Sequence, residues 1–231
     1  MREIAKALAS YIPTRWTEGI ANYAVMREHP WLLPSEYVVR DKRAYFARVN
    51  AILGGPNIKL TFLEFGVLDG DSIRFWATLN TNAESRFVGF DSFEGIPAAW
   101  RGREAGYFDR GGAVPDISDE RVRLVKGWFN RTLPHELPRV LGNDPEPTLL
   151  VHIDSDLHAS ALYCLSVLGS RLPSFHVMFD EYGAGEARAL RDVVSAYGAS
   201  FTPLLGFKRT AAAALPTRVF GRLDLLSDPP G

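Results

Sequence analysis

The sequence predicts an α/β fold built on a mostly parallel sheet, and three observations lead to this prediction. Short apolar runs typical of buried strands recur along the chain. Amphipathic stretches alternate with them, which implies right-handed crossovers between parallel neighbours. The chain then continues into two β-rich runs, residues 201–207 and 217–223, which we expect to pair as a terminal hairpin.

Length and composition indicate one globular domain. A chain of 231 residues with 46% apolar residues is large enough to bury a substantial core. A formal charge of −1 and scattered basic residues argue against a nucleic-acid or anionic-membrane partner. The single cysteine, Cys164, allows no internal disulfide and suits packing in a reducing, cytoplasmic compartment. We expect no membrane-spanning helix, because no apolar run approaches the required ~18 residues. We also expect no signal peptide, because the N-terminus has Arg2 and Lys6 but no sustained apolar stretch.

Residues 1–56 predict a set of helices upstream of the sheet. Two short amphipathic stretches are separated by Pro13, and their predicted inner faces are Ile4, Leu8 and Tyr11 in the first and Trp16, Ile20 and Tyr23 in the second. A third and longer helix is predicted to be capped by Ser35 and to stop at Gly54. We expect these helices to cover the sheet or part of the mouth of a site.

The chain is organised around residues 60–72, LTFLEFGVLDGDS. The apolar run 60–65 predicts a buried strand, and Asp71 and Ser72 are predicted to cap a helix from Ile73. Glycines in the intervening turn allow close approach of the backbone to a ligand, and the helix start suits a carboxylate. Glu64 would favour an ammonium group. A ligand with an amino-acid head carries both an ammonium and a carboxylate, and S-adenosylmethionine (SAM) is such a ligand. The dinucleotide fingerprint G-x-G-x-x-G is absent. A plain strand-turn-helix without a ligand is the alternative.

Four more strands and three more helices are predicted before the hairpin. A strand over 86–90 is followed by Asp91, one βαβ unit after Glu64, where an acid can bond ribose hydroxyls. A turn-forming role is the alternative for Asp91. The other predicted strands are 121–125, 148–153 and 175–179, and the helices are 132–141, 159–172 and 186–197.

Two segments between these elements are predicted to shape the site. Residues 92–119 are rich in glycine and proline and carry three aromatic side chains, which favours a lid over a linker. Gly127 permits close backbone approach, and Trp128 or Phe129 could stack on a purine. Core packing is the alternative for both aromatics.

Acids stand at the ends of four predicted strands: Glu64, Asp91, Asp154 and Asp180. If strands 148–153 and 175–179 are neighbours, Asp154 and Asp180 lie about 5 Å apart. Asp156 and Glu181 are beside them, and alternation would put Asp156 on the side of Asp154. Such carboxylates favour a hard cation such as Mg²⁺, whereas no cysteine or histidine set suggests zinc. Separation of the acids by capping and solvent, without a metal, is the alternative.

Five segments, in this order, resemble the macrocin O-methyltransferase family: EFGVLDGDS, GFDSFEGIP, KGWFNRTLP, HIDSDLHAS and FDEY. Its members are class I SAM-dependent enzymes that methylate sugar hydroxyls on macrolides and related natural products. The resemblance covers residues 60–182 approximately. It implies a Rossmann-like, doubly wound, seven-stranded sheet with an antiparallel last strand. We expect a single methyltransferase domain over 1–231, with a helical cap over 1–56 and a SAM-binding core over 57–231.

The resemblance also implies roles for individual residues. Asp156 would be the general base, and Mg²⁺ would be held by Asp154, Asp180 and Glu181. The cofactor SAM would be bound by Glu64, Gly66, Val67, Gly70, Ser72, Asp91, Ser92, Gly127, Trp128 and Asp154. Two departures from the family stand out. Members usually have two aspartates where this chain has Asp180 and Glu181, and often a tyrosine where it has His158. The second departure leaves His158 as a rival base.

The sequence thus predicts a Mg²⁺-dependent SAM O-methyltransferase that acts on a hydroxyl of a small molecule, such as a sugar on a natural product. Two alternatives stay open. One is a metal-independent O- or N-methyltransferase with His158 as base, and the other is a SAM- or nucleotide-binding module without catalysis. The acceptor and the oligomeric state, a homo-oligomer included, are not determined by the sequence.

Overall fold

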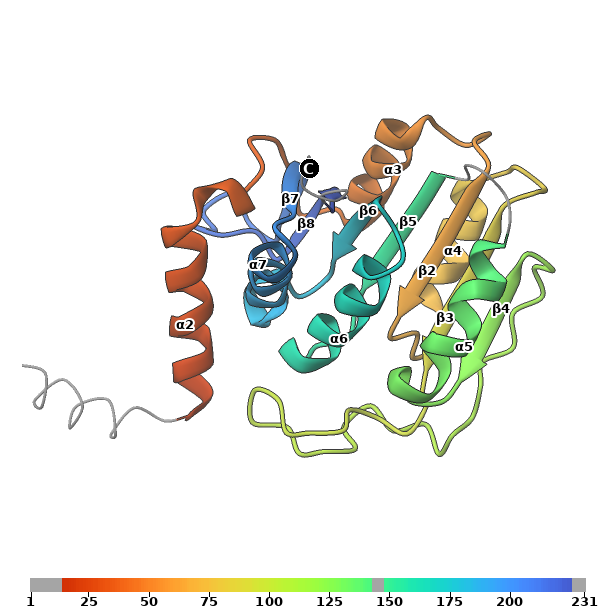
Figure 1. Ribbon diagram of the computed structural model, residues 1–231, viewed down its shortest axis with the longest axis horizontal. Helices are drawn as coiled ribbons and strands as arrows, with labels where there is room; N and C mark the ends of the chain where they lie inside the picture. The colour runs from red at the N-terminus through yellow and green to blue at the C-terminus, as the bar shows by residue number, and fades with distance from the viewer. Residues whose placement is uncertain (1–13, 143–147, 226–231) are drawn as a thin grey trace, which may run out of the picture.

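Figure 1 shows a computed structural model of the chain, which describes residues 14–142 and 148–225. Its centre is an eight-stranded sheet in the order β1-β7-β8-β6-β5-β2-β3-β4. The strands are β1 Tyr37–Val39, β2 Leu60–Phe65, β3 Arg86–Asp91, β4 Val122–Lys126, β5 Thr148–Ile153, β6 Ser174–Phe179, β7 Ser200–Lys208 and β8 Arg218–Asp224. The helices are α2 Thr14–Glu28, α3 Lys42–Leu53, α4 Asp71–Leu79, α5 Phe129–Leu141, α6 His158–Gly169 and α7 Glu186–Tyr197, with short 3₁₀ helices η1 Pro30–Leu32 and η2 Tyr182–Ala184.

The predicted fold class is confirmed, with one strand more than expected. All strand pairs are parallel except those of β8, which runs antiparallel between β6 and β7. The terminal hairpin is therefore present. The additional strand is β1, which pairs with the outer edge of β7, where Tyr37 lies opposite Gly206. The segment upstream of β2 is thus part of the sheet as well as a cover for it.

The start of the third N-terminal helix was predicted wrongly. Residues 37–39 form β1 instead of continuing a helix from Ser35, since Tyr-Val-Val favours an extended backbone beside an open sheet edge. Helix α3 begins at Lys42 and is capped by Asp41, whose carboxylate accepts from the N–H groups of Arg43 and Ala44. It ends at Gly54, as predicted. The predicted helical stretch over 4–11 lies outside the described residues.

Helix α2 buries a different face from the predicted one. Ile20 and Tyr23 are more than half exposed, whereas Val25 and Met26 pack into the core. The reason is tertiary, because α2 lies beside α7 and η2 at the flank of the sheet (Figure 1). The hydroxyl of Tyr182 donates to the carbonyl of Leu32 at 2.9 Å, which ties this flank to the end of β6.

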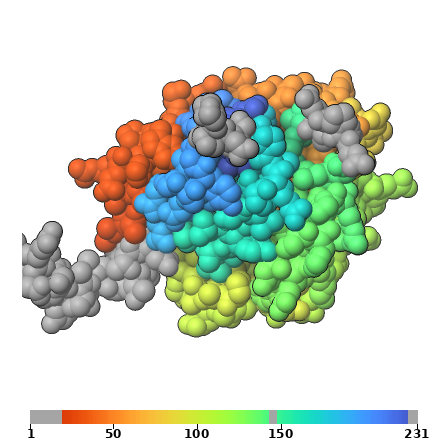
Figure 2. Space-filling model, viewed as in Figure 1, coloured from red at the N-terminus to blue at the C-terminus, as the bar shows by residue number. Residues whose placement is uncertain are grey.

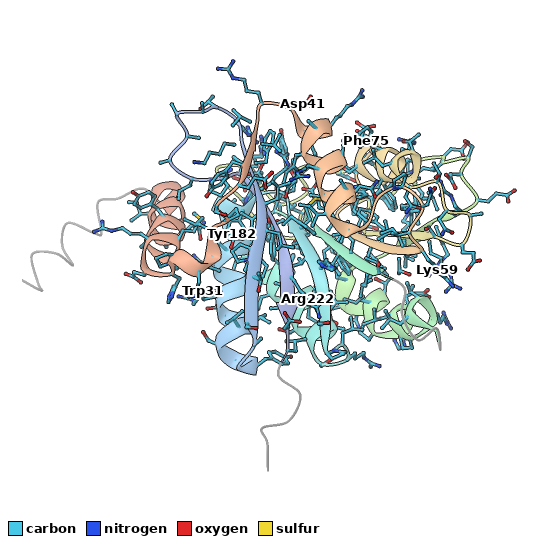
Figure 3. All side chains as sticks on the ribbon, turned by 90° about the horizontal axis from the view of Figure 1, so that it is seen from above. Trp31, Asp41, Lys59, Phe75, Tyr182 and Arg222 are labelled. Atoms are coloured by element: carbon cyan, nitrogen blue, oxygen red, sulfur yellow. The ribbon has the colours of Figure 1, made fainter. Side chains whose placement is uncertain are left out.

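The sheet separates two apolar cores (Figure 3). Helices α3 and α4 cover one face, where Phe62 stacks on Trp76 with ring centroids 5.3 Å apart. Helices α5, α6 and α7 cover the other face, where Phe65 stacks on Phe90 at 5.1 Å. Cys164 is fully buried in this second core, which confirms its packing role. In the described part of the chain, no helix is both long and apolar enough to cross a bilayer.

Residues 92–119 form an ordered loop at the carboxyl ends of the strands. Apart from two isolated bridges the loop has no regular structure, yet Phe93, Ile96 and Trp100 are buried. Ile96 and Trp100 pack against Ala184 of η2. In the space-filling view, part of this segment forms the lower edge of the molecule (Figure 2). The 92–119 loop therefore lies over the strand ends, which is the place expected for the predicted lid.

Candidate active site

A cavity of about 380 Å³ opens where the strands end and the 92–119 loop covers them. Its walls come from the turn after β2, the ends of β3, β5 and β6, the start of α5 and the first residue of α3. Of the residues predicted for the site, those that line it are Gly66, Val67, Ser72, Asp91, Ser92, Trp128, Asp154, Asp156, Asp180 and Glu181.

The turn after β2 is built differently from the prediction at its helix end. Helix α4 starts at Asp71 and its N-cap is Gly70, at φ 79°, so neither Asp71 nor Ser72 caps it with a side chain. Gly70 itself does not line the cavity. Gly66 lies at φ 96°, and a Cβ there would be 1.9 Å from the carbonyl oxygen of Asp154. This glycine is therefore required where β2 and β5 end side by side, as well as on the cavity wall.

Asp91 organises this turn through three backbone hydrogen bonds. Its Oδ2 accepts from the N–H groups of Val67 at 2.7 Å and Leu68 at 2.9 Å, and its Oδ1 accepts from Phe93 at 2.7 Å. Leu68 and Phe93 both have positive φ, which a side chain other than glycine adopts at some cost. The turn-forming role of Asp91 is thus present. A contact with ribose stays a prediction.

The two aromatic side chains at the start of α5 take different places. Trp128, at the N-cap, is 38% exposed and lines the cavity. The ring of Phe129 meets Phe65 edge-on, with centroids 5.6 Å apart, and packs against the core. Gly127 has φ 138° but does not line the cavity, and a Cβ there would meet Thr132. Both residues line the cavity, and Trp128 is the more exposed of the two rings.

The acids at the ends of β5 and β6 are brought together, since the two strands are parallel neighbours. Single ligand atoms of His152, Asp154 and Asp180 lie within 4.8 Å of one another. The Asp154 side chain makes no hydrogen bond or ion pair with the described residues. Burial, together with the charge of Asp180, raises the pKa of Asp154 well above its ordinary value.

Asp156 reaches the cavity by a turn and not by strand alternation, contrary to the prediction. Strand β5 ends at Ile153, and Asp156 adopts φ 62°, which aspartate tolerates better than most residues. Its carboxylate has no hydrogen-bond or ion-pair partner within residues 14–142 and 148–225. Burial, followed by the charges of Glu181 and Asp180, raises the pKa of Asp156 to about 7. A carboxylate of this kind is suited to accept a proton near neutral pH.

Asp180 and Glu181 are engaged by cationic side chains that the sequence did not reveal. Arg218 of β8 binds both oxygens of Asp180, at 2.6 and 2.8 Å, and Lys42 lies 3.3 Å from Oδ1. Burial alone would raise the pKa of Asp180, but His152, Lys42 and Arg218 together hold it well below its usual range. Glu181 pairs with Arg101 and Arg209 at 3.2 and 3.1 Å.

Glu64 is not on the cavity wall, in contrast to the prediction. It is almost fully buried, and its Oε1 bonds Nδ1 of His152 at 2.9 Å. Burial raises the pKa of Glu64. Burial also lowers the pKa of His152, but the carboxylates of Asp180 and Glu64 outweigh this effect and raise it to about 9. His152 is thus tied to Glu64 through Nδ1, while its Nε2 lies 3.7 Å from Oδ1 of Asp180.

His158, the predicted rival base, also lies outside the cavity lining. Its Nε2 is 3.0 Å from Oδ2 of Asp192 on α7, so the ring turns toward that helix. The reason is that His158 is the first residue of α6, which packs along α7. This placement does not support His158 as the base.

Arg103 in the 92–119 loop is a cavity residue that sequence reasoning missed. Its guanidinium lies over the rings of Tyr107 at 4.4 Å, Trp100 at 5.1 Å and Phe108 at 5.5 Å. The side chain makes no hydrogen bond or ion pair with the described residues. The aromatic content of the loop was the available signal, because arginine packs well on such rings.

Comparison with known proteins identifies the family. A family model described as a methyltransferase domain matches residues 63–182, just over half of the chain. The chain belongs to this methyltransferase family. The predicted resemblance to class I SAM-dependent methyltransferases is thereby confirmed.

The methyltransferase has a curated relative that acts on a sugar. It is 30% identical over 153 residues to 8-demethyl-8-(2,3-dimethoxy-alpha-L-rhamnosyl)-tetracenomycin-C 4'-O-methyltransferase from Streptomyces olivaceus. The match covers 57% of this chain and 56% of that protein, so the chain spans about half the length of the relative.

Two solved structures share the fold. The O-methyltransferase NovP is 20% identical, with a TM-score of 0.53 over 78% of this chain and 76% of that one. An O-methyltransferase from Bacillus cereus in complex with SAH is 14% identical, with a TM-score of 0.50 over 96% of this chain and 97% of that one.

Proposed function

We propose that this methyltransferase transfers the methyl group of SAM to a hydroxyl of a small molecule, with help from a divalent cation. The observation that carries the proposal is the placement of Asp154 and Asp156. Both carboxylates lack protein partners among the described residues, and both line the same cavity as the turn at the start of α4. The O-methyltransferase relative supports oxygen as the acceptor atom and a glycosylated natural product as the acceptor class.

The cavity residues fit SAM. The first turn of α4 offers free backbone N–H groups and the positive end of a helix dipole, which suit the carboxylate of the methionine part. Asp91 and Ser92 stand on the wall beside this turn, and the open ring of Trp128 suits a flat purine. When bound, SAM supplies an electrophilic sulfonium methyl, and the protein's task is to align the acceptor oxygen with it.

The acid cluster fits a hard divalent cation such as Mg²⁺. Asp154 is a half-buried carboxylate without a partner among the described residues, and Asp180 lies beside it on the cavity wall. Glu181 adds a carboxylate that is already shared by two arginines. When bound, such a cation lowers the pKa of an acceptor hydroxyl and orients it. A neighbour of the same fold, at 15% identity and a TM-score of 0.50, is described as cmcI-D160 Mg-SAM.

The remaining cavity residues would handle the acceptor. Asp156 accepts the proton of the acceptor hydroxyl, because its carboxylate faces the cavity and accepts no hydrogen bond from the described residues. Arg103 and the buried Trp100 form the wall on the side of the loop. They hold acceptor oxygens and a ring face and keep water from the reacting atoms.

A direct test of the proposal uses the full chain, SAM and a panel of hydroxylated glycosides and phenols. We expect methylated product by mass spectrometry and SAM binding by calorimetry, with product formation increased by Mg²⁺. SAM binding without product from any acceptor class would favour a non-catalytic binding module. Methylation at nitrogen instead of oxygen would contradict the proposed acceptor atom.

We expect Asp91→Ala to weaken SAM binding at least tenfold. The change removes a charged acceptor for ribose hydroxyls, each bond contributing roughly 1.5–3 kcal/mol, and also the three bonds that hold the turn. Calorimetry of SAM binding measures the effect. Asp91→Asn is the matched variant, since its amide oxygen can still accept from Val67 and Leu68 while the bond from Phe93 and the charge are lost. Unchanged affinity in both variants would reduce Asp91 to a turn residue.

Trp128→Ala should weaken the binding of SAM and of adenosine by similar factors. Loss of one aromatic–base stack costs about 1–3 kcal/mol, which is roughly 5-fold to 150-fold in affinity. Native circular dichroism must be shown first. Phe129→Ala is the contrasting variant, because that ring, which also lines the cavity, packs edge-on against Phe65 in the core, and its loss should lower thermal stability. A loss of stability with unchanged affinity in Trp128→Ala would place this ring in the core as well.

A further inference from the structure

Lys42 is a cationic residue on the cavity wall that comes from outside the matched family domain. It is the first residue of α3, while the family match begins at residue 63. Figure 3 labels its neighbour Asp41 at the start of this helix, on the side of the sheet away from α7. The ammonium lies 3.3 Å from Oδ1 of Asp180 and 5.2 Å from the ring centroid of Phe46. Its positive charge also favours the ionised forms of Asp154 and Glu64, which works against the rise that burial causes in the pKa of each.

Three basic side chains lie within 4.0 Å of Oδ1 of Asp180, and they differ in how freely they can move away from it. Arg218 binds both oxygens of Asp180 and has a side chain only 9% exposed. His152 is fully buried, with Nε2 3.7 Å from Oδ1, and is fixed by Glu64 on its other nitrogen. Lys42 alone of the three lines the cavity and is 38% exposed. Its ammonium can move into solvent at little cost, whereas the other two cannot.

We propose that Lys42 is a built-in counter-ion that competes with a divalent cation for Asp180. The ammonium lies 3.3 Å from Oδ1 of Asp180, its charge also acts on Asp154, and it repels a second cation brought to these carboxylates. Binding of the divalent cation therefore displaces the ammonium from Asp180. Lys42 in this way sets how tightly the cluster holds a metal, and this inference rests on the proposed function of the cluster.

The geometry distinguishes this role from a purely structural one. A structural ion pair would stabilise the fold, yet at this exposure it would contribute little to stability. Asp180 stays paired with Arg218 when Lys42 is removed, so the fold keeps its buried charge compensation. What changes is the positive charge in front of the cluster, and that charge acts on an incoming cation.

The test measures Mn²⁺ binding to the full chain by electron paramagnetic resonance, with Mn²⁺ as a probe that shares the carboxylate preference of Mg²⁺. We expect Lys42→Met to bind Mn²⁺ at least tenfold more tightly than the wild type. Lys42→Arg keeps the charge and should bind no more tightly than the wild type. Lys126→Met removes a lysine on β4, four strands away from β6, and should leave Mn²⁺ binding unchanged. Asp154→Asn should abolish the bound signal and thereby assign it to the cluster.

Equal or weaker Mn²⁺ binding by Lys42→Met, or undiminished binding by Asp154→Asn, would overturn the inference. So would the absence of Mn²⁺ binding in both the wild type and Lys42→Met. Thermal melting of every variant shows whether the fold is intact. Methyl transfer by the wild type in EDTA is assayed alongside. Turnover there, without Mn²⁺ binding, would leave the methyltransferase function standing while the role of Lys42 fails.

Discussion

Asp156→Asn is expected to lower the rate of methyl transfer by roughly 10²–10⁴-fold, the usual range for loss of a general base. The side chain lines the cavity. No described residue forms a hydrogen bond or ion pair with its carboxylate, so the carboxylate is available to an acceptor hydroxyl. Asparagine keeps the size of the side chain but cannot take up the proton. Single-turnover measurements with saturating SAM and acceptor would separate this effect from binding.

Two measurements guard this prediction. SAM affinity and Mn²⁺ affinity of Asp156→Asn should stay within about threefold of the wild type, since neither ligand set depends on this carboxylate alone. His158→Gln is the matched control. It should retain most activity, because the histidine faces Asp192 and not the cavity. The opposite pattern, an active Asp156→Asn and an inactive His158→Gln, would return the role of base to His158.

Asp154→Asn should abolish divalent-cation binding and reduce methyl transfer on the order of 10²–10³-fold, as expected for loss of several kcal/mol of charge stabilisation. Asp154 is the sharpest probe of the metal, because it makes no hydrogen bond or ion pair with another described residue that the change would break. SAM binding should survive better, since the turn at α4 and Trp128 are untouched. EDTA should inhibit the wild type, and Mg²⁺ should restore it.

The neighbouring acids give less direct answers. Glu181→Gln should also reduce activity, but it releases Arg101 and Arg209 as well. Asp180→Asn leaves the buried Arg218 without its charge partner, which costs about 3–5 kcal/mol in such pairs, so its melting temperature must be measured with its activity. Full wild-type activity in EDTA, with no metal found by elemental analysis, would contradict a metal-dependent reaction.

The central layer of the fold follows from the sequence alone. Strands β2 and β5 and helix α7 have the predicted bounds, and β3 runs one residue further, to Asp91. These elements are buried by their own apolar pattern, so local composition carries the information. The same applies to the acids at strand ends. In a parallel sheet the carboxyl ends of the strands share one edge, and adjacency of β5 and β6 then brings Asp154 and Asp180 together.

Only the tertiary structure decided which of these acids are free. Glu64 turns to His152, Asp180 is held by Lys42 and Arg218, and Glu181 is held by two arginines, whereas Asp154 and Asp156 are left open. These partners come from α3, β8 and two loops, and no local pattern links them to the acids. The same limit explains β1, which is a strand only because the edge of β7 is open beside it. Charge compensation and edge pairing depend on which distant segments meet, and that is fixed by packing of the whole chain and not by the period of any one segment.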